Sequence, residues 1–332
     1  MITSANFRLR ALFVEMLAAG LCLAAVMAGS AHAVVINTTT GTGNTSAPAN
    51  DPGWDNVGVL GIGTGVYVGN GWVLTAGHVG GGSIVLNGGT YAMRSGSGIT
   101  LTNNGAAGKT ANTDLYMFQL ISPPPGLPGV TIASAMASPG DQVTMIGAGR
   151  NRGMPMEWTV TGTTWTPAPP GTGNESGYAT QNSRSMRWGT NSLTTTGTWV
   201  QYPDYTSGDF FAFNTTFDKG PFSDEAQAVA GDSGGAVFHK NGSVWELSGM
   251  ILAVGGLPGQ QPNPVVYAVF GDTTYAADLS FYRPQILAIV PEPALVPATA
   301  VTLAGIAAIA RLTGRSKKKR AASRRTPPAR VH

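Results

Sequence analysis

The chain of 332 residues has almost no cysteine. Its single cysteine, Cys22, lies in an apolar N-terminal stretch, so the rest of the sequence can form no disulfide and has no thiol for catalysis or metal binding. It also lacks an HExxH motif and any cluster of cysteines, the patterns typical of zinc sites. We therefore expect neither a metal nor a cofactor.

Positive charge is scarce in the body of the chain. The net charge of +3 comes from the two ends, because nine of the 20 basic residues follow position 310 and two precede position 11. Residues 34–310 hold nine basic and sixteen acidic residues, a balance of about −7. A body of this charge gives no reason to expect a nucleic-acid partner.

The first 33 residues have the three parts of a secretory signal. Arg8 and Arg10 precede an apolar run, LAAGLCLAAVMAG (17–29), and the small residues AHA (31–33) form a cleavage site. We therefore expect residues 1–33 to be a signal peptide and the mature chain to begin near Val34. Residues 34–56 are poor in apolar side chains, which favours a loose leader or a short propeptide.

The C-terminal end has a second targeting pattern. VPEP (290–293) precedes an apolar run at 294–310, and a basic tail follows. This order favours a short membrane segment whose tail lies on the cytoplasmic side. Residues 291–332 together resemble the PEP-CTERM sorting signal of Gram-negative bacteria. That resemblance implies an exosortase-like processing enzyme as a partner, membrane contact through 294–310 before processing, and delivery to the cell envelope, the cell surface or the outside. An ordinary C-terminal anchor is the alternative.

Helical periodicity is almost missing from the body. Short apolar or alternating runs, such as GVYVGNGWVLTA (65–76) and DQVTMIGAG (141–149), are separated by glycine, asparagine and proline, which is typical of antiparallel β structure. Residues 57–290 suffice for one all-β unit in two parts. Aromatic side chains within 151–223 favour ordered strands there over a linker. A short closing helix that ends near Pro284 is expected within 276–290.

A hydroxyl stands between glycines in AVAGDSGGAVF (228–238), where Asp232 and Ser233 lie side by side. A serine needs a base to act as a nucleophile, and histidine is the usual one because its pKa lies near neutrality. Between the two terminal segments the chain has only two histidines. His239 follows Ser233 by six residues on an expected hairpin and is predicted to be a surface residue, whereas His78 ends an alternating apolar run.

A carboxylate opens another apolar run, NTDLYMFQL (112–120). Burial of Asp114 there would be unfavourable without a partner, although a turn-capping role is the alternative when it is taken alone. As a set, TAGHV (75–79), TDLYMFQL (113–120) and GDSGG (231–235) resemble in order and spacing the trypsin/chymotrypsin-like serine proteases. The resemblance covers most of residues 57–290.

This resemblance implies a fold, an activity and a set of site residues. The fold is all-β, with two six-stranded antiparallel barrels and a short C-terminal helix. The activity is that of an exported serine endopeptidase, which hydrolyses protein or peptide substrates through an acyl-enzyme. The implied catalytic residues are His78, Asp114 and Ser233, and the N–H groups of Gly231 and Ser233 form the oxyanion hole. A non-catalytic trypsin-fold protein for surface or matrix binding is the alternative.

The sequence departs from the family pattern at three places. The expected base of the specificity pocket is Gln227, whose neutral side chain argues against a preference for Arg or Lys set by a pocket aspartate there. Leu252 and Ala253 stand where the family has serine and tryptophan. The family's apolar N-terminus, which inserts beside the aspartate equivalent to Asp232 after activation, is not recognisable, so we expect Asp232 to have another partner.

Overall fold

The structure, a computed structural model, describes residues 34–201, 208–220 and 222–291. The chain divides into two units, Met1–Val290 and Pro291–His332, and every helix and strand described below belongs to the first. The expected signal peptide (1–33) and membrane segment (294–310) lie outside the described residues. Within those residues, no helix is long and apolar enough to cross a bilayer.

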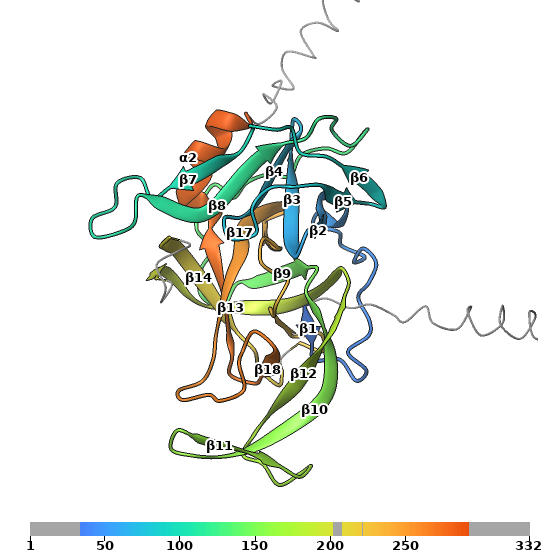
Figure 1. Cartoon of the computed structure of the whole chain (residues 1–332), viewed down its shortest axis with the longest axis vertical. Helices are drawn as coiled ribbons and strands as arrows, with labels where there is room; N and C mark the ends of the chain where they lie inside the picture. The colour runs from blue at the N-terminus through green and yellow to red at the C-terminus, as the bar shows by residue number, and fades with distance from the viewer. Residues whose placement is uncertain (1–33, 202–207, 221, 292–332) are drawn as a thin grey trace, which may run out of the picture. The chain divides into compact units, whose positions relative to one another are not determined.

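The first half of the fold is a seven-stranded antiparallel sheet (Figure 1). A short 3₁₀ helix, η1 (Trp54–Asn56), leads into it. Its strands are β2 (Val57–Leu60), β3 (Gly63–Gly69), β4 (Trp72–Ala76), β5 (Ile84–Leu86), β6 (Gly89–Tyr91), β7 (Ile99–Thr102) and β8 (Asn112–Gln119). They neighbour one another in the order β6-β5-β2-β3-β4-β8-β7. The sheet has seven strands where six were expected, and it curls back on itself. The segment directly after β6 pairs with the end of β8, where the N–H of Arg94 donates to the carbonyl of Gln119 at 2.7 Å and the N–H of Ile121 to that of Ala92 at 2.9 Å.

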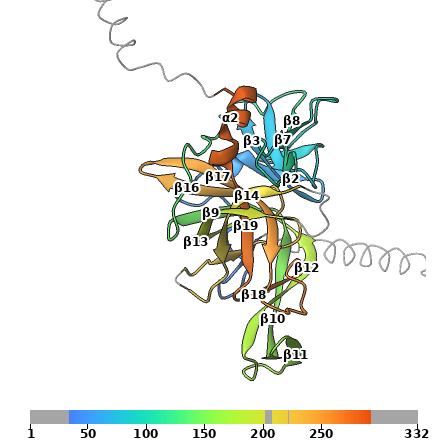
Figure 2. The ribbon, with the colours of Figure 1, turned by 90° about the vertical axis from the view of Figure 1, so that its left-hand side faces the viewer.

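The second half contains a closed barrel of six strands, as expected (Figure 2). In the order in which they neighbour one another, these are β13 (Arg187–Val200), β14 (Phe210–Thr216), β19 (Thr273–Asp278), β17 (Val244–Gly255), β16 (Ala236–Asn241) and β9 (Gln142–Gly147). Val143 and Met145 of β9 pack with Phe213 of β14 in one buried apolar cluster. Side chains at alternate positions of the strands therefore meet inside the barrel.

A four-stranded sheet extends beyond the barrel strands in both views (Figures 1 and 2). Its strands, in order, are β11 (Thr164–Ala168), β10 (Arg150–Thr161), β12 (Glu175–Arg184) and β18 (Tyr267–Val269). Trp158 packs edge to face with Trp165 and with Tyr267, at centroid distances of 6.1 and 5.9 Å. Aromatic residues of the region 151–223 thus form the apolar centre of an ordered sheet, which confirms that it is not a linker.

The residues directly after the expected signal peptide are part of the packed fold. Strand β1 (Val35–Ile36) pairs with β15 (Ala226–Gln227), and residues 34–36 are at most 1% exposed. The guanidinium of Arg152 donates to the carbonyls of Ile36 and Thr38 at 2.9 and 2.7 Å. Residues 34–36 are therefore ordered, because their three apolar side chains suffice to form a buried strand. Composition did not reveal this strand, since three residues hardly change the average for residues 34–56.

The C-terminal helix, α2 (Leu279–Ile289), begins at a capping aspartate. The carboxylate of Asp278 accepts from the N–H of Ser280 at 2.9 Å. The expectation that the helix ends near Pro284 is wrong, because the helix continues to Ile289. The continuation buries Ile286 completely, so packing outweighs the loss of one hydrogen bond at the proline.

One buried hydroxyl connects this helix to both halves of the fold. Tyr282 Oη accepts from Thr113 Oγ1 at 3.1 Å and from the N–H of Phe211 at 2.9 Å, and it donates to Asn103 Oδ1 at 3.0 Å. Thr113 lies in β8 of the sheet and Phe211 in β14 of the barrel. The hydroxyl thereby uses its proton and both lone pairs inside the molecule.

We expect Tyr282→Phe to lower the free energy of unfolding by about 1–3 kcal/mol, because the N–H of Phe211 loses its buried acceptor. Urea denaturation followed by tryptophan fluorescence measures this change. The matched control is Tyr91→Phe, at a half-buried tyrosine of β6. Equal stability of wild type and Tyr282→Phe would contradict the role of the hydroxyl.

Candidate active site

Two of the residues predicted from the sequence meet where β4 and β8 pair. Ala76 at the end of β4 lies opposite Leu115, so His78 comes against Asp114. The carboxylate of Asp114 accepts from the backbone N–H of His78 at 2.8 Å and lies 2.7 Å from its ring Nδ1. The side chain of Asp114 is fully buried, whereas that of His78 is 31% exposed.

This contact orients the imidazole. An ionised carboxylate can only accept hydrogen bonds, so Nδ1 of His78 carries a proton and, in the neutral ring, Nε2 is the basic atom. The other histidine between the terminal segments, His239, lies in β16 with its Nε2 atom 3.5 Å from the carboxylate of Asp141. It belongs to a separate pair.

The loop that carries Ser233 reaches the same place through β3. The N–H of Thr64 donates to the carbonyl of Ser233 at 2.8 Å. A methyl group at Gly63 would lie 2.5 Å from Cγ2 of Val79 and 2.9 Å from the carbonyl oxygen of Ser233. Because Val79 directly follows His78, the structure brings the loops of His78 and Ser233 against one short segment, residues 63–64.

Most backbone groups of the Ser233 loop have a partner. The N–H groups at positions 230, 232 and 234 donate to the carbonyls of Val265, Val229 and Ile251. The carbonyl of residue 230 accepts from the N–H of Arg150, and that of residue 231 from both Thr64 Oγ1 and Arg184 Nη2. The carbonyls of residues 232 and 233 accept from the N–H groups of Gly235 and Thr64. The shape of this loop is therefore determined by hydrogen bonds to several neighbouring segments.

Two donors of this loop remain open. The N–H groups of Gly231 and Ser233 donate to no acceptor in the part of the chain that the structure describes. Both residues are partly exposed. Gly231 adopts a φ of +94°, a conformation that favours glycine. The loop thus presents two unpaired donors that are separated by one residue.

Asp232, between these donors, is buried completely. Its carboxylate accepts from the N–H groups of Gly149 at 2.8 Å, Val229 at 2.8 Å and Val34 at 3.4 Å. Burial raises the pKa of Asp232 to about 7, although these N–H groups and the charge of Arg184 act in the opposite direction. A carboxyl with this many donors holds the loop, the barrel and the N-terminal segment together.

The contact with Val34 corrects the expectation that Asp232 has a partner other than the N-terminal segment. Val34 is the residue at which the mature chain was expected to begin, and it lies 198 positions from Asp232 in the sequence. The signal that could have revealed this contact is the apolar run VVI (34–36) directly after the small residues AHA. The run is not conspicuous because residues 34–56 as a whole are poor in apolar side chains and favour a loose leader.

The three residues expected at the specificity pocket are placed differently from one another. Gln227 is fully buried in β15, where its Oε1 atom accepts from Thr274 Oγ1 at 3.1 Å. Its Nε2 atom has no hydrogen-bond partner within the described ranges. Leu252 is 3% exposed and packs in the largest apolar cluster. Ala253 lines a pocket.

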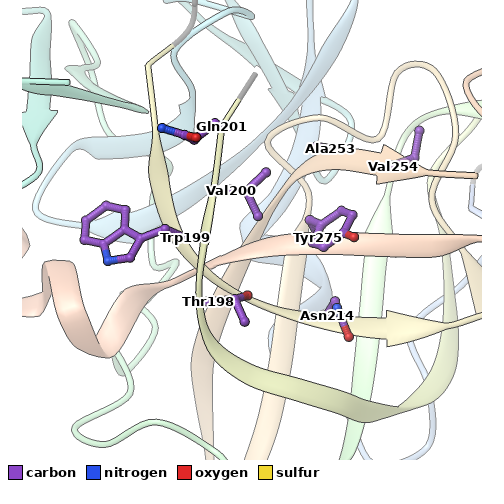
Figure 3. Close-up of a pocket in the computed structure, with 8 residues that line it drawn as sticks. All are labelled: Thr198, Trp199, Val200, Gln201, Asn214, Ala253, Val254 and Tyr275. Carbon is purple, nitrogen blue, oxygen red and sulfur yellow. The ribbon is translucent and has the colours of Figure 1, made fainter. Parts of the chain in front are cut away.

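This pocket has a volume of about 490 Å³ and lies among strands β13, β14, β17 and β19 (Figure 3). Its lining consists of Thr198, Trp199, Val200, Gln201, Asn214, Ala253, Val254 and Tyr275. Two residues before Ala253, the carbonyl of Ile251 accepts the N–H of Gly234. The pocket therefore lies along the strand that borders the Ser233 loop.

A family model described as Trypsin matches residues 42–277. Comparison with curated proteins gives no match. Similar solved structures include the Rv3671c protease from M. tuberculosis in its active form, with 16% identity, a TM-score of 0.39 and coverage of 71% of this chain and 76% of that one. Another is kallikrein-related peptidase 10 in complex with Zn²⁺, with 13% identity, a TM-score of 0.42 and coverage of 74% and 98%. Likeness at this level carries no argument about activity.

The raised pKa of Asp232 predicts a stability that depends on pH. Its folded pKa of about 7 lies above the ordinary value of 3.8, so between these values the folded chain holds a proton that the unfolded chain releases. The contribution of this carboxyl to the free energy of unfolding therefore falls as the pH rises from about 4 to about 7, by up to about 1.4 kcal/mol per pH unit.

Urea titrations across this range test the dependence on a chain that keeps the residues before Val34. We expect Asp232→Asn to reduce the slope, because asparagine does not titrate there, whereas Glu225 and Asp272, whose pKa burial also raises to about 7, still contribute. The exposed Asp51→Asn is the matched control and keeps the slope. A slope that is the same in Asp232→Asn and wild type would show that this carboxyl is not the source.

Proposed function

The chain belongs to the trypsin family, and on that premise we propose that it is a serine endopeptidase that cleaves proteins or peptides through an acyl-enzyme. Family membership supports a serine-type peptidase. The observation that carries the assignment of roles is the 2.7 Å contact between Asp114 and His78 Nδ1, beside the loop of Ser233. No contact in the described residues favours the alternative of a non-catalytic binding protein.

In the proposed reaction, Ser233 Oγ attacks the scissile carbonyl carbon while His78 Nε2 takes its proton. A C–O bond forms, and the carbonyl oxygen acquires the negative charge. His78 then gives the proton to the leaving amine as the C–N bond breaks, which leaves the acyl-enzyme. Water then attacks the acyl-enzyme by the same two steps. His78 takes a proton from the water and returns it to Ser233 Oγ, and the carboxylic acid is released. Asp114 keeps the imidazole oriented and stabilises its charged form.

The N–H groups of Gly231 and Ser233 are proposed to bind the oxyanion. The support is that these two donors are open, while the N–H groups at 230, 232 and 234 are used. Donors held in place by the surrounding structure need no reorganisation when charge develops on the substrate oxygen. One such donor contributes a factor of about 10²–10³ in rate in comparable enzymes.

A fluorophosphonate probe tests the assignment, because it forms a covalent bond with an activated serine. We expect the wild type to be labelled at Ser233 and Ser233→Ala to be unlabelled. His78→Ala should slow labelling by about 10⁴-fold, since the hydroxyl loses its base. His239→Ala is the matched control and should react at the wild-type rate.

Casein cleavage in the same variants separates a peptidase from a binding protein. Cleavage should disappear in Ser233→Ala and His78→Ala and persist in His239→Ala. Labelling that is equally strong with and without the Ser233 hydroxyl would refute the proposal.

The proposal includes export and processing at both ends. The first 33 residues are removed as a signal peptide, and the PEP-CTERM-like segment 291–332 is processed by an exosortase-like enzyme at the envelope of a Gram-negative bacterium. The support for the first cut is the 3.4 Å distance from the nitrogen of Val34 to Asp232 Oδ1. A free α-amino group at that nitrogen supplies a full positive charge to a buried carboxylate, whereas a peptide N–H supplies only a dipole.

A mass spectrum of the exported protein checks both ends. We expect Val34 as the first residue and a chain that ends before the basic tail. A chain that begins with Ala33 should be labelled at least about tenfold more slowly than one that begins with Val34, because loss of a buried ion pair costs about 3–5 kcal/mol. A different first residue, or equal labelling of the two chains, would contradict the role of Val34. A mature protein that keeps the tail would contradict C-terminal processing.

A further inference from the structure

Arg184, the last residue of β12, lies where the four-stranded sheet meets the Ser233 loop. Its guanidinium donates to four backbone carbonyls, namely Ala148 at 2.8 Å, Gly61 at 3.0 Å, Gly63 at 2.9 Å and Gly231 at 3.3 Å. Within the described ranges it forms no ion pair with a carboxylate. The planar guanidinium thus binds backbone carbonyls. The compact ammonium group of a lysine could not reach all four of them from this position.

The four carbonyls belong to three different parts of the fold. Gly61 and Gly63 flank the turn between β2 and β3, against which Val79 packs. Ala148 directly follows β9 of the barrel, and Gly231 belongs to the Ser233 loop. One side chain therefore connects the sheet that carries His78, the barrel and the loop that carries Ser233.

The contact with Gly231 acts on the peptide group that separates the two open donors. The N–H of Gly231 belongs to the Ala230–Gly231 peptide group, and the N–H of Ser233 belongs to the Asp232–Ser233 peptide group. The Gly231–Asp232 peptide group lies between these two and links their directions. Its carbonyl accepts from Arg184 Nη2 and from Thr64 Oγ1, and its N–H donates to Val229. A net change in the backbone torsions of residues 231 and 232, on either side of this peptide, would change the relative direction of the two donors.

The guanidinium also packs directly on Gly231. A methyl group at Gly231 would lie 2.8 Å from Arg184 Nε and 2.9 Å from the Cα atom of Gly149. Glycine at this position is thus required by the close approach of Arg184 as well as by the positive φ. The side chain and the loop conformation fit each other.

We propose that Arg184 is a positioning residue that holds the N–H groups of Gly231 and Ser233 in the arrangement that binds the oxyanion. The inference rests on the proposed function and names a part of it that the family motifs do not contain. Because Arg184 acts through Gly231, its loss weakens transition-state stabilisation more than substrate binding. Thr64 still holds the same carbonyl, so the loss is partial.

The experiment compares fluorophosphonate labelling and casein-peptide hydrolysis by wild type, Arg184→Met, Arg184→Lys, Arg184→Ala and Arg94→Met. Arg94 is exposed and serves as the matched control for loss of one arginine. We expect Arg184→Met and Arg184→Lys to label and turn over about 10- to 100-fold more slowly, with KM changed less than about threefold. Arg184→Lys keeps the charge and most of the stem but cannot span four carbonyls. Added guanidinium should restore part of the labelling rate of Arg184→Ala.

Thermal unfolding of each variant separates positioning from folding. Folded Arg184→Met that reacts at the wild-type rate would overturn the inference, and so would a wild-type rate in Arg184→Lys. If the unfolded fraction of an Arg184 variant accounts for its whole loss of rate, and guanidinium does not restore the rate of Arg184→Ala, the inference is also overturned. If the wild type itself is not labelled at Ser233, the proposed function fails and the inference fails with it. Labelling of wild type and Arg184→Met alike leaves the function standing and removes only the role of Arg184.

Discussion

The arrangement of the site depends on one carboxylate without access to water. Burial of Asp232 is unfavourable by itself, and the structure offsets it with three backbone N–H groups. One N–H comes from the N-terminal segment, one from the residues after β9 and one from the loop itself. The position of each segment therefore depends on the other two. The open donors at Gly231 and Ser233 flank this carboxylate, so their placement follows from the same set of contacts.

The fold achieves this without a disulfide in its body. Buried or half-buried arginines hold the long loops by donating to backbone carbonyls. Arg152 holds residues 36–39, and Arg184 holds the turn before β3 together with the Ser233 loop. Such contacts satisfy carbonyls that no strand partner reaches, and each guanidinium can bind several at once. In a chain with little charge, two of the nine cations of the body, Arg152 and Arg184, thus have structural positions.

The four-stranded sheet beside the barrel is more than an appendage. Its strands β10 and β12 supply Arg152 and Arg184, and a small cluster around Trp158 gives the sheet an apolar centre. Three of its strands, β10, β11 and β12, lie between β9 and β13 in the sequence, where a short loop would connect the two barrel strands equally well. Its residues reach both the N-terminal segment and the loop of Ser233, so a region that composition marks as ordinary β structure bears directly on the candidate site.

Local patterns in the sequence determined the β texture and the three motifs that contain His78, Asp114 and Ser233, and the family resemblance of those motifs implied the barrel of the second half. Each of these is legible because strand alternation and glycine-rich turns act over a few residues. Only the tertiary structure decided that the first half is a seven-stranded sheet, that α2 continues past Pro284, and that Val34 and Arg184 reach the Ser233 loop. These outcomes depend on contacts between residues far apart in the chain, 198 positions for Val34 and Asp232 and 123 for Arg184 and Gly61. No short pattern records such pairings, because the partners of a buried carboxylate or a guanidinium are backbone groups, which every residue possesses.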